Sequence, residues 1–303
     1  MSKELISKIN QYIPMNRILE QEPMKLHTTF RVGGPAKLFL RVESEAELQQ
    51  ILALMKTEGE DYYLIGNGSN LLISDKGYDG VMIQLSKGFA DVKVDGRRLY
   101  CEAGATLSAI ARVALEHSLT GFEFAAGIPG SLGGAIVMNA GAYGGEMKQV
   151  VEAVRLMDAE GNIIEKSCEE MHFGYRHSIL KEASYIVLGA TIRLEAGEHA
   201  KIKEQMDALA SQRREKQPLE YPSAGSTFKR PEGYFAGKLI QDAGLRGFQV
   251  GGAQVSEKHC GFVINKEQAT ASEIFNLIQE VRQRVANEFG VTLETEVICL
   301  GEF

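Results

Sequence analysis

Two glycine-rich stretches contain the residues whose types and spacing point most directly to chemistry. The longer one, residues 127–145, reads GIPGSLGGAIVMNAGAYGG and has seven glycines among its nineteen residues. Glycine loses more backbone freedom on folding than any other residue, so such a run indicates backbone at positive φ or against a ligand. The groups that it makes available to a ligand are mainly clustered backbone N–H groups, which suit a phosphate or a flat polar ring. A tightly packed turn region is the alternative, but a second such stretch upstream favours ligand binding.

The second stretch, residues 66–70, reads GNGSN and lies between the apolar runs 62–65 and 71–73. This pattern predicts a strand, an anion-binding turn and a strand. Leu71 stands where a dinucleotide fingerprint has its third glycine, so that fingerprint fails. No Gly-Lys-Ser/Thr follows either stretch, which excludes a nucleotide-triphosphate P-loop. Two glycine stretches about sixty residues apart fit one long ligand with a pyrophosphate in its middle.

An arginine and a serine stand in two further polar stretches. Arg176, in FGYRHS at residues 173–178, could bind a carboxylate through its planar guanidinium, although a surface arginine fits the pattern equally well. Ser226 follows Ala224 and Gly225, whose small size exposes its hydroxyl. No G-x-S-x-G motif surrounds this serine, so a serine hydrolase is a weak hypothesis and an ordinary turn serine is the alternative.

Cations near this serine and a carboxylate near the C-terminus are the remaining candidate functional residues. Lys216, Lys229 and Arg230 make the serine stretch cationic within an acidic protein, which suits a phosphorylated or carboxylated substrate. A final strand is predicted over residues 291–300, and its alternation puts Glu296 on a half-apolar face. A carboxylate there is either a charge at the rim or a functional acid.

Composition excludes several classes of protein. The chain has 303 residues, of which 44% are apolar and 24% charged, as in soluble globular proteins with room for two or more domains. The net charge of −7 disfavours binding to nucleic acid or to an anionic membrane. There is no apolar signal core and no apolar run of about 18 residues, so we expect a cytoplasmic protein without membrane insertion. The four cysteines form no C-x-x-C motif and the histidines lack ligand spacing, which predicts neither disulfides nor a metal site.

The predicted helices and strands around these residues form a mixed α+β pattern, not the regular βαβ alternation of a doubly wound sheet. Periodicity and caps predict helices over residues 3–13, 44–59, 106–117, 198–216, 234–243 and 270–289. Strands are predicted over residues 36–42, 62–65, 71–73, 81–85, 185–194, 249–255, 261–264 and 291–300. Capping boxes are predicted at Ser44/Glu47 and Thr270/Glu273, and hairpins over residues 91–102 and 151–166. A composition change near Ala196 makes the following polar helix a connector into a second domain.

Taken together, the motifs resemble one family closely, the bacterial UDP-N-acetylenolpyruvoylglucosamine reductases (UDP-N-acetylmuramate dehydrogenases). The resemblance runs from about Asn16 to Leu300. The motifs on which it rests are GNGSNLL at 66–72, GIPGSLGGAIVMNAGAYG at 127–144, FGYRHS at 173–178, RREKQP at 213–218, SAGSTFKRP at 223–231 and LETEV at 293–297.

The resemblance implies an α+β fold, with an FAD-binding domain of the vanillyl-alcohol-oxidase (PCMH) type and a C-terminal α+β substrate-binding domain. On this basis we expect an N-terminal helix and lead-in over residues 1–22. The FAD-binding domain, made of two α+β subdomains, would span 23–197, and the substrate-binding domain 198–303. The implied activity is NADPH-dependent reduction of UDP-N-acetylglucosamine enolpyruvate to UDP-N-acetylmuramate through FAD, in peptidoglycan precursor synthesis.

The resemblance also implies that the two glycine stretches bind FAD noncovalently, and that NADPH reduces the flavin and is then replaced by the sugar nucleotide. The implied cofactor contacts are Gly66, Asn67, Gly68, Ser69, Asn70, Leu71, Gly127, Ile128, Pro129, Gly130, Ser131, Gly133, Gly134, Asn139, Gly141 and Ala142. No metal is implied.

The family's catalytic residues fall on Arg176, on Ser226 as the proton donor, and on Glu296. The implied substrate contacts are Tyr175, Lys216, Lys229, Arg230 and Lys238. Some members have an additional loop whose tyrosine covers the substrate. The region after Arg176 has no room for that loop, so the chain resembles the shorter form and Tyr175 does not replace the loop tyrosine. Arg230 stands where some members have an asparagine.

Two other functions are compatible with parts of this pattern. Another FAD-dependent oxidase or dehydrogenase on the same flavin fold predicts rapid reoxidation of the reduced flavin by oxygen and indifference to UDP-sugars. A non-catalytic module that binds nucleotide-sugars predicts a colourless protein in which the side chains of Ser226 and Glu296 are dispensable.

Overall fold

The computed structural model describes residues 3–303, except for the side chain of residue 87. The chain divides into two compact units, each assembled from three separate segments. The first unit comprises Met1–Leu19, Phe39–Gly66 and Met82–Arg213. The second comprises Glu20–Leu38, Asn67–Val81 and Arg214–Phe303. Each unit therefore brings together residues that are far apart in the sequence.

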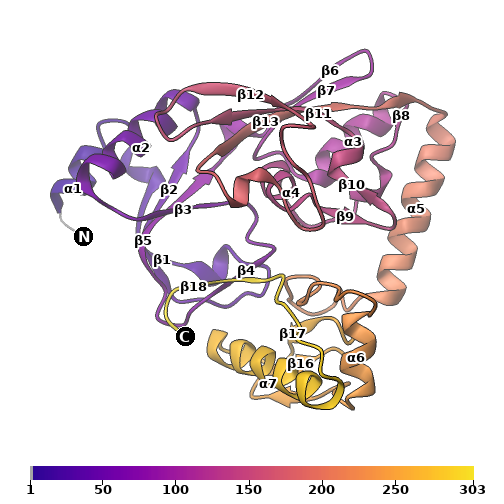
Figure 1. Ribbon diagram of the computed structural model, residues 1–303. Helices are drawn as coiled ribbons and strands as arrows, with labels where there is room; N and C mark the ends of the chain where they lie inside the picture. Colours follow the sequence, from indigo (N-terminus) through magenta and orange to yellow (C-terminus); the bar gives the residue numbers. More distant parts are fainter. Residues whose placement is uncertain (1–2) are drawn as a thin grey trace. The chain divides into compact units, whose positions relative to one another are not determined.

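The first unit contains a five-stranded antiparallel sheet with the strand order β12-β11-β13-β7-β6. The strands are β6 (Val92–Asp95), β7 (Arg98–Glu102), β11 (Val151–Met157), β12 (Ile163–Ser167) and β13 (Ile186–Arg193). Helices α3 (Leu107–Glu116) and α4 (Leu132–Met138) lie along one face of this sheet (Figure 1), and a continuous apolar core fills the space between them. Both predicted hairpins are confirmed, because β6 pairs with β7 and β11 pairs with β12; Gly96 and Gly161 adopt positive φ at their turns.

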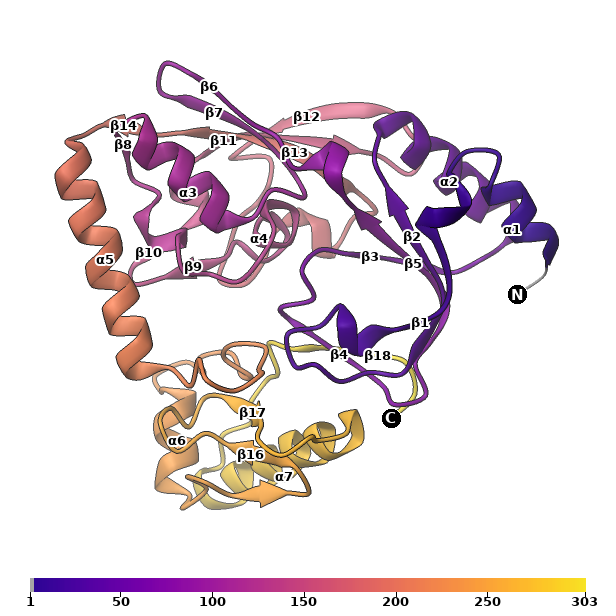
Figure 2. The same cartoon turned by 180° about the vertical axis from the view of Figure 1, so that it is seen from behind.

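Another sheet has four strands in the order β1-β2-β5-β3. These strands are β1 (Ile18–Pro23), β2 (Pro35–Val42), β3 (Tyr62–Ile65) and β5 (Tyr78–Leu85). Helices α1 (Lys3–Ile9) and α2 (Glu45–Glu58) lie side by side in both Figures 1 and 2. The first unit ends within α5 (His199–Lys216), an 18-residue helix in which Ile202 is buried.

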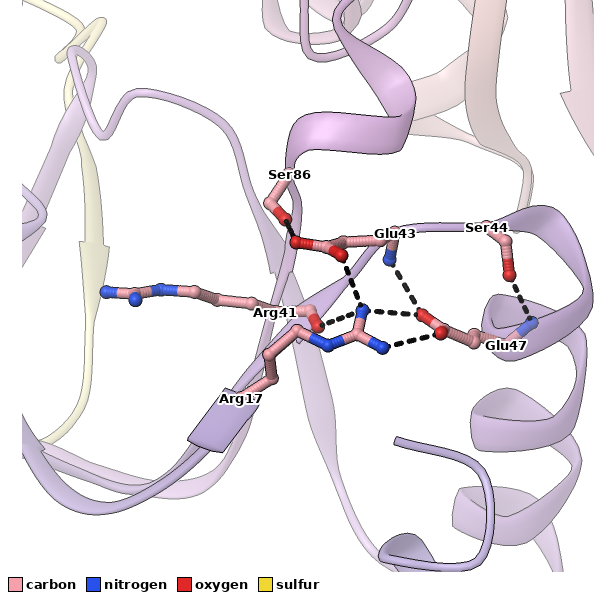
Figure 3. Close-up of polar contacts among 6 residues, drawn as sticks. All are labelled: Arg17, Arg41, Glu43, Ser44, Glu47 and Ser86. Atoms are coloured by element: carbon pink, nitrogen blue, oxygen red, sulfur yellow. Dashed lines mark hydrogen bonds and ion pairs between the residues drawn. The ribbon is translucent and has the colours of Figure 1, made fainter. Parts of the chain in front are cut away.

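Arg17 connects the start of β1 to α2 through a polar network (Figure 3). Its guanidinium donates to both carboxylate oxygens of Glu47, at 2.6 and 2.9 Å, and lies 3.3 Å from a carboxylate oxygen of Glu43. Only half of the predicted capping box forms. Ser44 accepts from the Glu47 N–H, but the Glu47 carboxylate accepts from the Glu43 N–H and from Arg17. The nearby cation thus redirects the carboxylate that a local capping rule assigns to the helix end.

The second unit is built on the antiparallel sheet β15-β16-β17 and on α7 (Ala271–Phe289), which packs against all three strands. The remaining elements of this unit are β4 (Leu71–Ile73), β15 (Gln249–Val250), β16 (Ala253–Val255), β17 (Val263–Asn265), β18 (Ile298–Leu300) and α6 (Ala236–Asp242). The capping box at Thr270 and Glu273 is confirmed, and Gly290 ends α7 in the left-handed conformation. Asp75 adds a second cap, because its carboxylate accepts from the N–H groups of Ala271 and Ser272.

Short elements complete the chain. Two-residue strands pair as β9 (Gly141–Ala142) with β10 (Gly145–Glu146) and as β8 (Leu119–Thr120) with β14 (Glu195–Ala196). The 3-10 turns are Met15–Arg17, Met24–Leu26, Lys87–Phe89, Glu123–Ala125, Met147–Gln149 and Ile179–Lys181.

The structure corrects the predicted strand over 291–300, since only Ile298–Leu300 is a strand, paired in parallel with β4. Before it, Thr295 forms one isolated bridge with Phe228. The carbonyls of Leu293 and Glu294 accept instead from Arg282 Nε and from the Lys229 N–H. Alternation predicts a strand well only where a neighbouring strand continues alongside it.

Candidate active site

The first glycine stretch connects β3 to β4, which confirms the predicted strand, turn and strand. Gly68 has a φ of +59°, and a Cβ at this position would overlap the carbonyl of His27. The Gly68 carbonyl in turn accepts from the Thr29 N–H at 3.2 Å. Only glycine fits here, because the turn is left-handed and packed tightly against the chain.

The second glycine stretch contains the helix α4, which the sequence analysis did not predict. Leu132, Ala135 and Ile136 are buried along one side of this helix. The N–H of Leu132 donates to the carbonyl of Ala105 at 2.8 Å and anchors the start of the helix. Burial of this apolar stripe outweighs the low helix propensity of the glycines at 133 and 134.

Gly66, the first residue of the first glycine stretch, lies against Ser131 of the second stretch within the first unit. A Cβ on Gly66 would overlap Oγ of Ser131, so only glycine lets the serine hydroxyl lie against the backbone at this position. Ser131 is buried at the N-cap position of α4, yet its hydroxyl makes no cap hydrogen bond. A buried hydroxyl beside side-chain-free backbone fits the polar groups of a bound flavin dinucleotide.

Asn139 does not offer its side chain to a ligand. It is fully buried at the C-cap of α4 with a φ of +42°. Its Nδ2 donates to Glu146 Oε2 and to the Gly174 carbonyl, and its Oδ1 accepts from the Lys148 N–H, each at 2.9 Å. Both amide hydrogens are therefore engaged within the protein, and one of them supports the turn that carries Arg176.

Arg176 lies at the tip of a tight turn. The backbones of Gly174 and His177 close this turn with two hydrogen bonds of 3.0 and 3.2 Å, and Arg176 itself has a φ of +53°. Its guanidinium carbon lies 5.3 Å from the centroid of the Tyr175 ring. A left-handed non-glycine residue is costly in backbone energy, and such residues gather at functional sites.

Ser226 and Thr227 have opposite environments in the second unit. Ser226 is exposed and follows Gly225, which has a φ of +73°. Thr227 is fully buried, and its Oγ1 accepts from the Val263 N–H at 2.9 Å. Its own N–H donates to the Gly261 carbonyl at 2.8 Å. The buried threonine thus holds the strand-like segment from which the serine hydroxyl projects into solvent.

The same threonine brings Glu296 close to Ser226. The N–H of Glu296 donates to the Thr227 carbonyl at 2.8 Å. On the other side, Asn70 Nδ2 donates to the Glu296 carbonyl at 2.9 Å. The segments of two predicted catalytic residues and the side chain of one residue of the first glycine stretch are therefore connected by hydrogen bonds within one unit.

The predicted cationic contacts differ in how they are engaged. Lys229 Nζ lies 2.8 Å from Glu294, and this pairing lowers the pKa of the Glu294 carboxyl. The guanidinium carbon of Arg230 lies 4.0 Å from the centroid of the exposed Phe235 ring. Its Nε donates to the Tyr234 carbonyl at 3.3 Å. Arg230 thus has a defined orientation on the surface.

Lys238 forms an ion pair with Asp242 one turn later in α6. Lys216 is exposed at the last residue of α5. A further cation, Arg213, was not predicted from the sequence; it lies in the same RREKQP motif as Lys216 but is half-buried. On a polar helix, an arginine shows no sequence signal that distinguishes burial from exposure.

The glycine stretches and the sheets around them define a flavoprotein of the FAD-dependent oxidoreductase class. The model of the FAD-binding domain family matches residues 36–167. The structure of Phl p 4, a grass pollen allergen with glucose dehydrogenase activity, covers 64% of this chain and 44% of its own. Its TM-score is 0.50 at 15% identity, a likeness of fold alone.

Similarity to known sequences and structures also defines the family. The model of the UDP-N-acetylenolpyruvoylglucosamine reductase C-terminal domain matches residues 217–300. The reductase of that name from Caldanaerobacter subterraneus is 52% identical over 302 residues and covers 100% of both chains. The crystal structure of the Thermus caldophilus reductase has a TM-score of 0.81 at 35% identity, covering 93% of this chain and 98% of the other. The chain belongs to the UDP-N-acetylenolpyruvoylglucosamine reductase family, and FAD is its cofactor.

The helices were compared with the length and apolar character that a membrane-spanning helix needs. Within residues 3–303, no helix is long and apolar enough to cross a membrane.

Proposed function

We propose that this protein reduces UDP-N-acetylglucosamine enolpyruvate to UDP-N-acetylmuramate with electrons from NADPH, a step in peptidoglycan precursor synthesis. FAD, when bound at the glycine stretches, supplies the hydride to the terminal methylene carbon of the enolpyruvyl group. In this assignment residues 23–197 bind FAD and residues 198–303 bind the sugar nucleotide. Family membership and the linked positions of Ser226 and Glu296 support the proposal.

Arg176 and Glu296 stabilise the charge that develops on the substrate. The enolpyruvyl group is an enol ether conjugated to a carboxylate, so hydride addition moves negative charge onto the carboxylate as an enolate. The Arg176 guanidinium binds that carboxylate through its planar fork. Glu296 helps as a protonated acid or by orienting a donor, because a second anion would repel the enolate.

Ser226 donates the proton to the α-carbon. The observation that carries this role is the hydrogen bond from the Glu296 N–H to the Thr227 carbonyl, which holds the exposed Ser226 beside the segment of Glu296. A serine hydroxyl is a weak acid, so the step needs a basic carbanion and close placement. Thr227 cannot substitute for it, because its own hydroxyl is buried and bonded.

The remaining side chains bind the anionic parts of the substrate. Lys216, Lys229 and Arg230 contact its carboxylate or its pyrophosphate, and Tyr175 and Lys238 are further substrate contacts. The ion pairs of Lys229 and Lys238 are exposed and therefore weak, so both ammonium groups remain accessible to a phosphate.

Anaerobic spectroscopy with matched sugar nucleotides tests this function. NADPH should bleach the flavin absorbance, and UDP-N-acetylglucosamine enolpyruvate should restore it. UDP-N-acetylglucosamine, which lacks the enolpyruvyl group, should leave the flavin reduced. In D₂O the product should carry deuterium on the α-carbon. Rapid reoxidation by oxygen together with indifference to both sugar nucleotides would instead assign the protein to the flavin oxidases.

A further inference from the structure

Arg213 lies against the first residue of the second glycine stretch. It occupies the last turn of α5, where its Nη1 is 3.1 Å and its Cδ 3.2 Å from the position that a Cβ on Gly127 would take. The Arg213 side chain therefore occupies the space that a side chain at position 127 would need. Any larger residue at position 127 would push it away.

This guanidinium is half-buried and lacks an anionic partner. Within residues 3–303 it makes no hydrogen bond or ion pair. Burial lowers its pKa, and the only group that opposes this effect is the Tyr143 phenol, near the other end of the glycine stretch. Arg17 is the contrasting case, because its partly buried guanidinium is neutralised by Glu43 and Glu47.

Partial burial without a counter-charge costs a cation part of its hydration, and an anionic ligand would offset this cost. Gly127 lies within the region that the FAD-binding family model matches, residues 36–167. Arg213 lies outside it and also outside the C-terminal match, residues 217–300. In oxidised FAD the isoalloxazine ring is neutral, and the permanent negative charge is on the pyrophosphate. A planar guanidinium can bind phosphate oxygens through two parallel hydrogen bonds.

We propose that Arg213 binds the pyrophosphate of FAD and holds it against the Gly127 backbone. The cation reaches the cofactor from α5, outside the sequence region that identifies the FAD-binding domain. This role concerns cofactor binding alone and does not depend on which substrate the reduced flavin serves.

Flavin titrations of the apoprotein test this role without NADPH or a sugar nucleotide. The probes are FAD and riboflavin, which has the same ring but no phosphate, each followed by flavin fluorescence. Arg213→Met should raise the Kd for FAD by about 10- to 100-fold, the usual range for losing a hydrogen bond to a charged group. Arg213→Lys should give an intermediate loss, because it keeps the charge without the fork. The Kd for riboflavin should stay unchanged in both variants.

Arg214→Met is the matched control, since this neighbour is exposed on the same helix and the change removes the same charge. It should bind FAD like the unmodified protein. Thermal unfolding of each apoprotein checks folding, and Arg213→Lys carries the test if the methionine variant does not fold. The salt dependence of FAD binding should be weaker in Arg213→Met than in the unmodified protein.

Three outcomes would overturn the proposal. The Kd for FAD could remain unchanged in Arg213→Met. The affinities for FAD and riboflavin could fall equally, which would place Arg213 at the ring. FAD could bind normally while NADPH or the sugar nucleotide binds more weakly, which would assign the cation to another pyrophosphate. If the unmodified protein binds FAD normally but does not reduce the substrate, only the proposed function is contradicted.

Discussion

Ser226 and Thr227 are neighbours in the chain but differ in what their hydroxyls can do. The Thr227 hydroxyl is buried and accepts a backbone hydrogen bond, whereas Ser226 is exposed. One residue holds the segment in place, and the other is available for proton transfer. A motif alone does not separate these two roles, because both residues belong to the same SAGSTFKRP stretch.

We predict that Ser226→Ala separates the two half-reactions. Bleaching of the flavin by NADPH should keep its rate, since it needs no proton on the substrate carbon. Reoxidation by UDP-N-acetylglucosamine enolpyruvate should slow by about 10²- to 10⁴-fold, the usual cost of losing a general acid. Stopped-flow absorbance follows each half separately. Equal slowing of both halves would assign Ser226 to flavin positioning, and no slowing would place the proton donor elsewhere.

Thr227→Val provides the comparison for that experiment. It should lower the free energy of unfolding by about 1–3 kcal/mol, because the buried Val263 N–H loses its acceptor. Ser226→Ala should change it by about 1 kcal/mol or less, since its hydroxyl is exposed.

Arg176 is predicted to act through the shape of its guanidinium as well as its charge. Arg176→Lys keeps the charge but loses the planar fork, so it should slow the enolpyruvyl half-reaction. FAD binding should be unchanged, in contrast to Arg213→Lys. Single-turnover kinetics and flavin titration measure the two quantities. Unchanged turnover of the Arg176 variant would remove this residue from the site.

At the scale of elements, the buried side chains of Asn139 and Ser178 connect α4 to the turn of Arg176. Asn139→Ala would leave the Lys148 N–H without its acceptor, and the Gly174 carbonyl would keep only the hydrogen bond from the His177 N–H. We predict a loss of about 2–4 kcal/mol in the free energy of unfolding, together with slower reduction of the substrate through the displaced Arg176 turn. Urea unfolding and single-turnover kinetics measure these effects.

Asn139→Gly separates the two contributions of this residue. Glycine adopts the φ of +42° more easily than alanine, so it should recover about 1 kcal/mol of stability. It cannot restore the hydrogen bonds, so the slower turnover should persist. Turnover at the normal rate in both variants would show that Asn139 serves only stability.

The network of Arg17 and Glu47 makes stability depend on pH. Burial raises the pKa of Glu47, but hydrogen bonds from Arg17 and from the Glu43 N–H outweigh it and hold the pKa below its ordinary value of 4.5. A carboxyl whose pKa is lowered by folding stabilises the fold above its unfolded pKa, and this contribution disappears as the pH falls through the folded value.

Accordingly, Arg17→Met should cost about 1–3 kcal/mol of unfolding free energy at neutral pH. The difference from the unmodified protein should shrink progressively below pH 4.5. Arg97→Met is the control, because its ion pair with Glu195 is exposed and should contribute little at any pH. Urea titrations across pH measure both, and a difference that stays constant into acid would contradict the assignment to Glu47.

At the scale of the whole molecule, each compact unit depends on segments that are distant in sequence. The apolar core of the second unit includes Phe30, Val32 and Leu72 together with residues of α7. The strand β18 near the C-terminus pairs with β4, and Asp75 caps α7. This unit therefore includes residues that a boundary at 198 does not capture.

FAD should be retained by noncovalent contacts alone. Neither glycine stretch contains a histidine or cysteine that could be linked to the flavin. The purified protein should be yellow, and acid or heat should release the flavin into the filtrate while the polypeptide loses its colour. Flavin that remains with the denatured chain would refute noncovalent binding.

Features that depend on a few neighbouring residues could be predicted from the sequence. The hairpin turns at Gly96 and Gly161, the capping box at Thr270 and the stop at Gly290 all follow from local hydrogen bonds and backbone sterics. The ordered set of motifs was enough to identify the family and its FAD-binding fold, because each motif is a short contiguous string.

Which distant residues contact one another became evident only from the folded chain. Helix α4 forms in a glycine-rich stretch because distant residues bury its apolar side, and the final strand is short because β4 accompanies it for three residues only. Asn139 was predicted as a cofactor contact, but its side chain is engaged by Glu146 and Gly174. Burial and hydrogen-bond partners across long sequence separations carry no local signal, since they depend on how the whole chain packs.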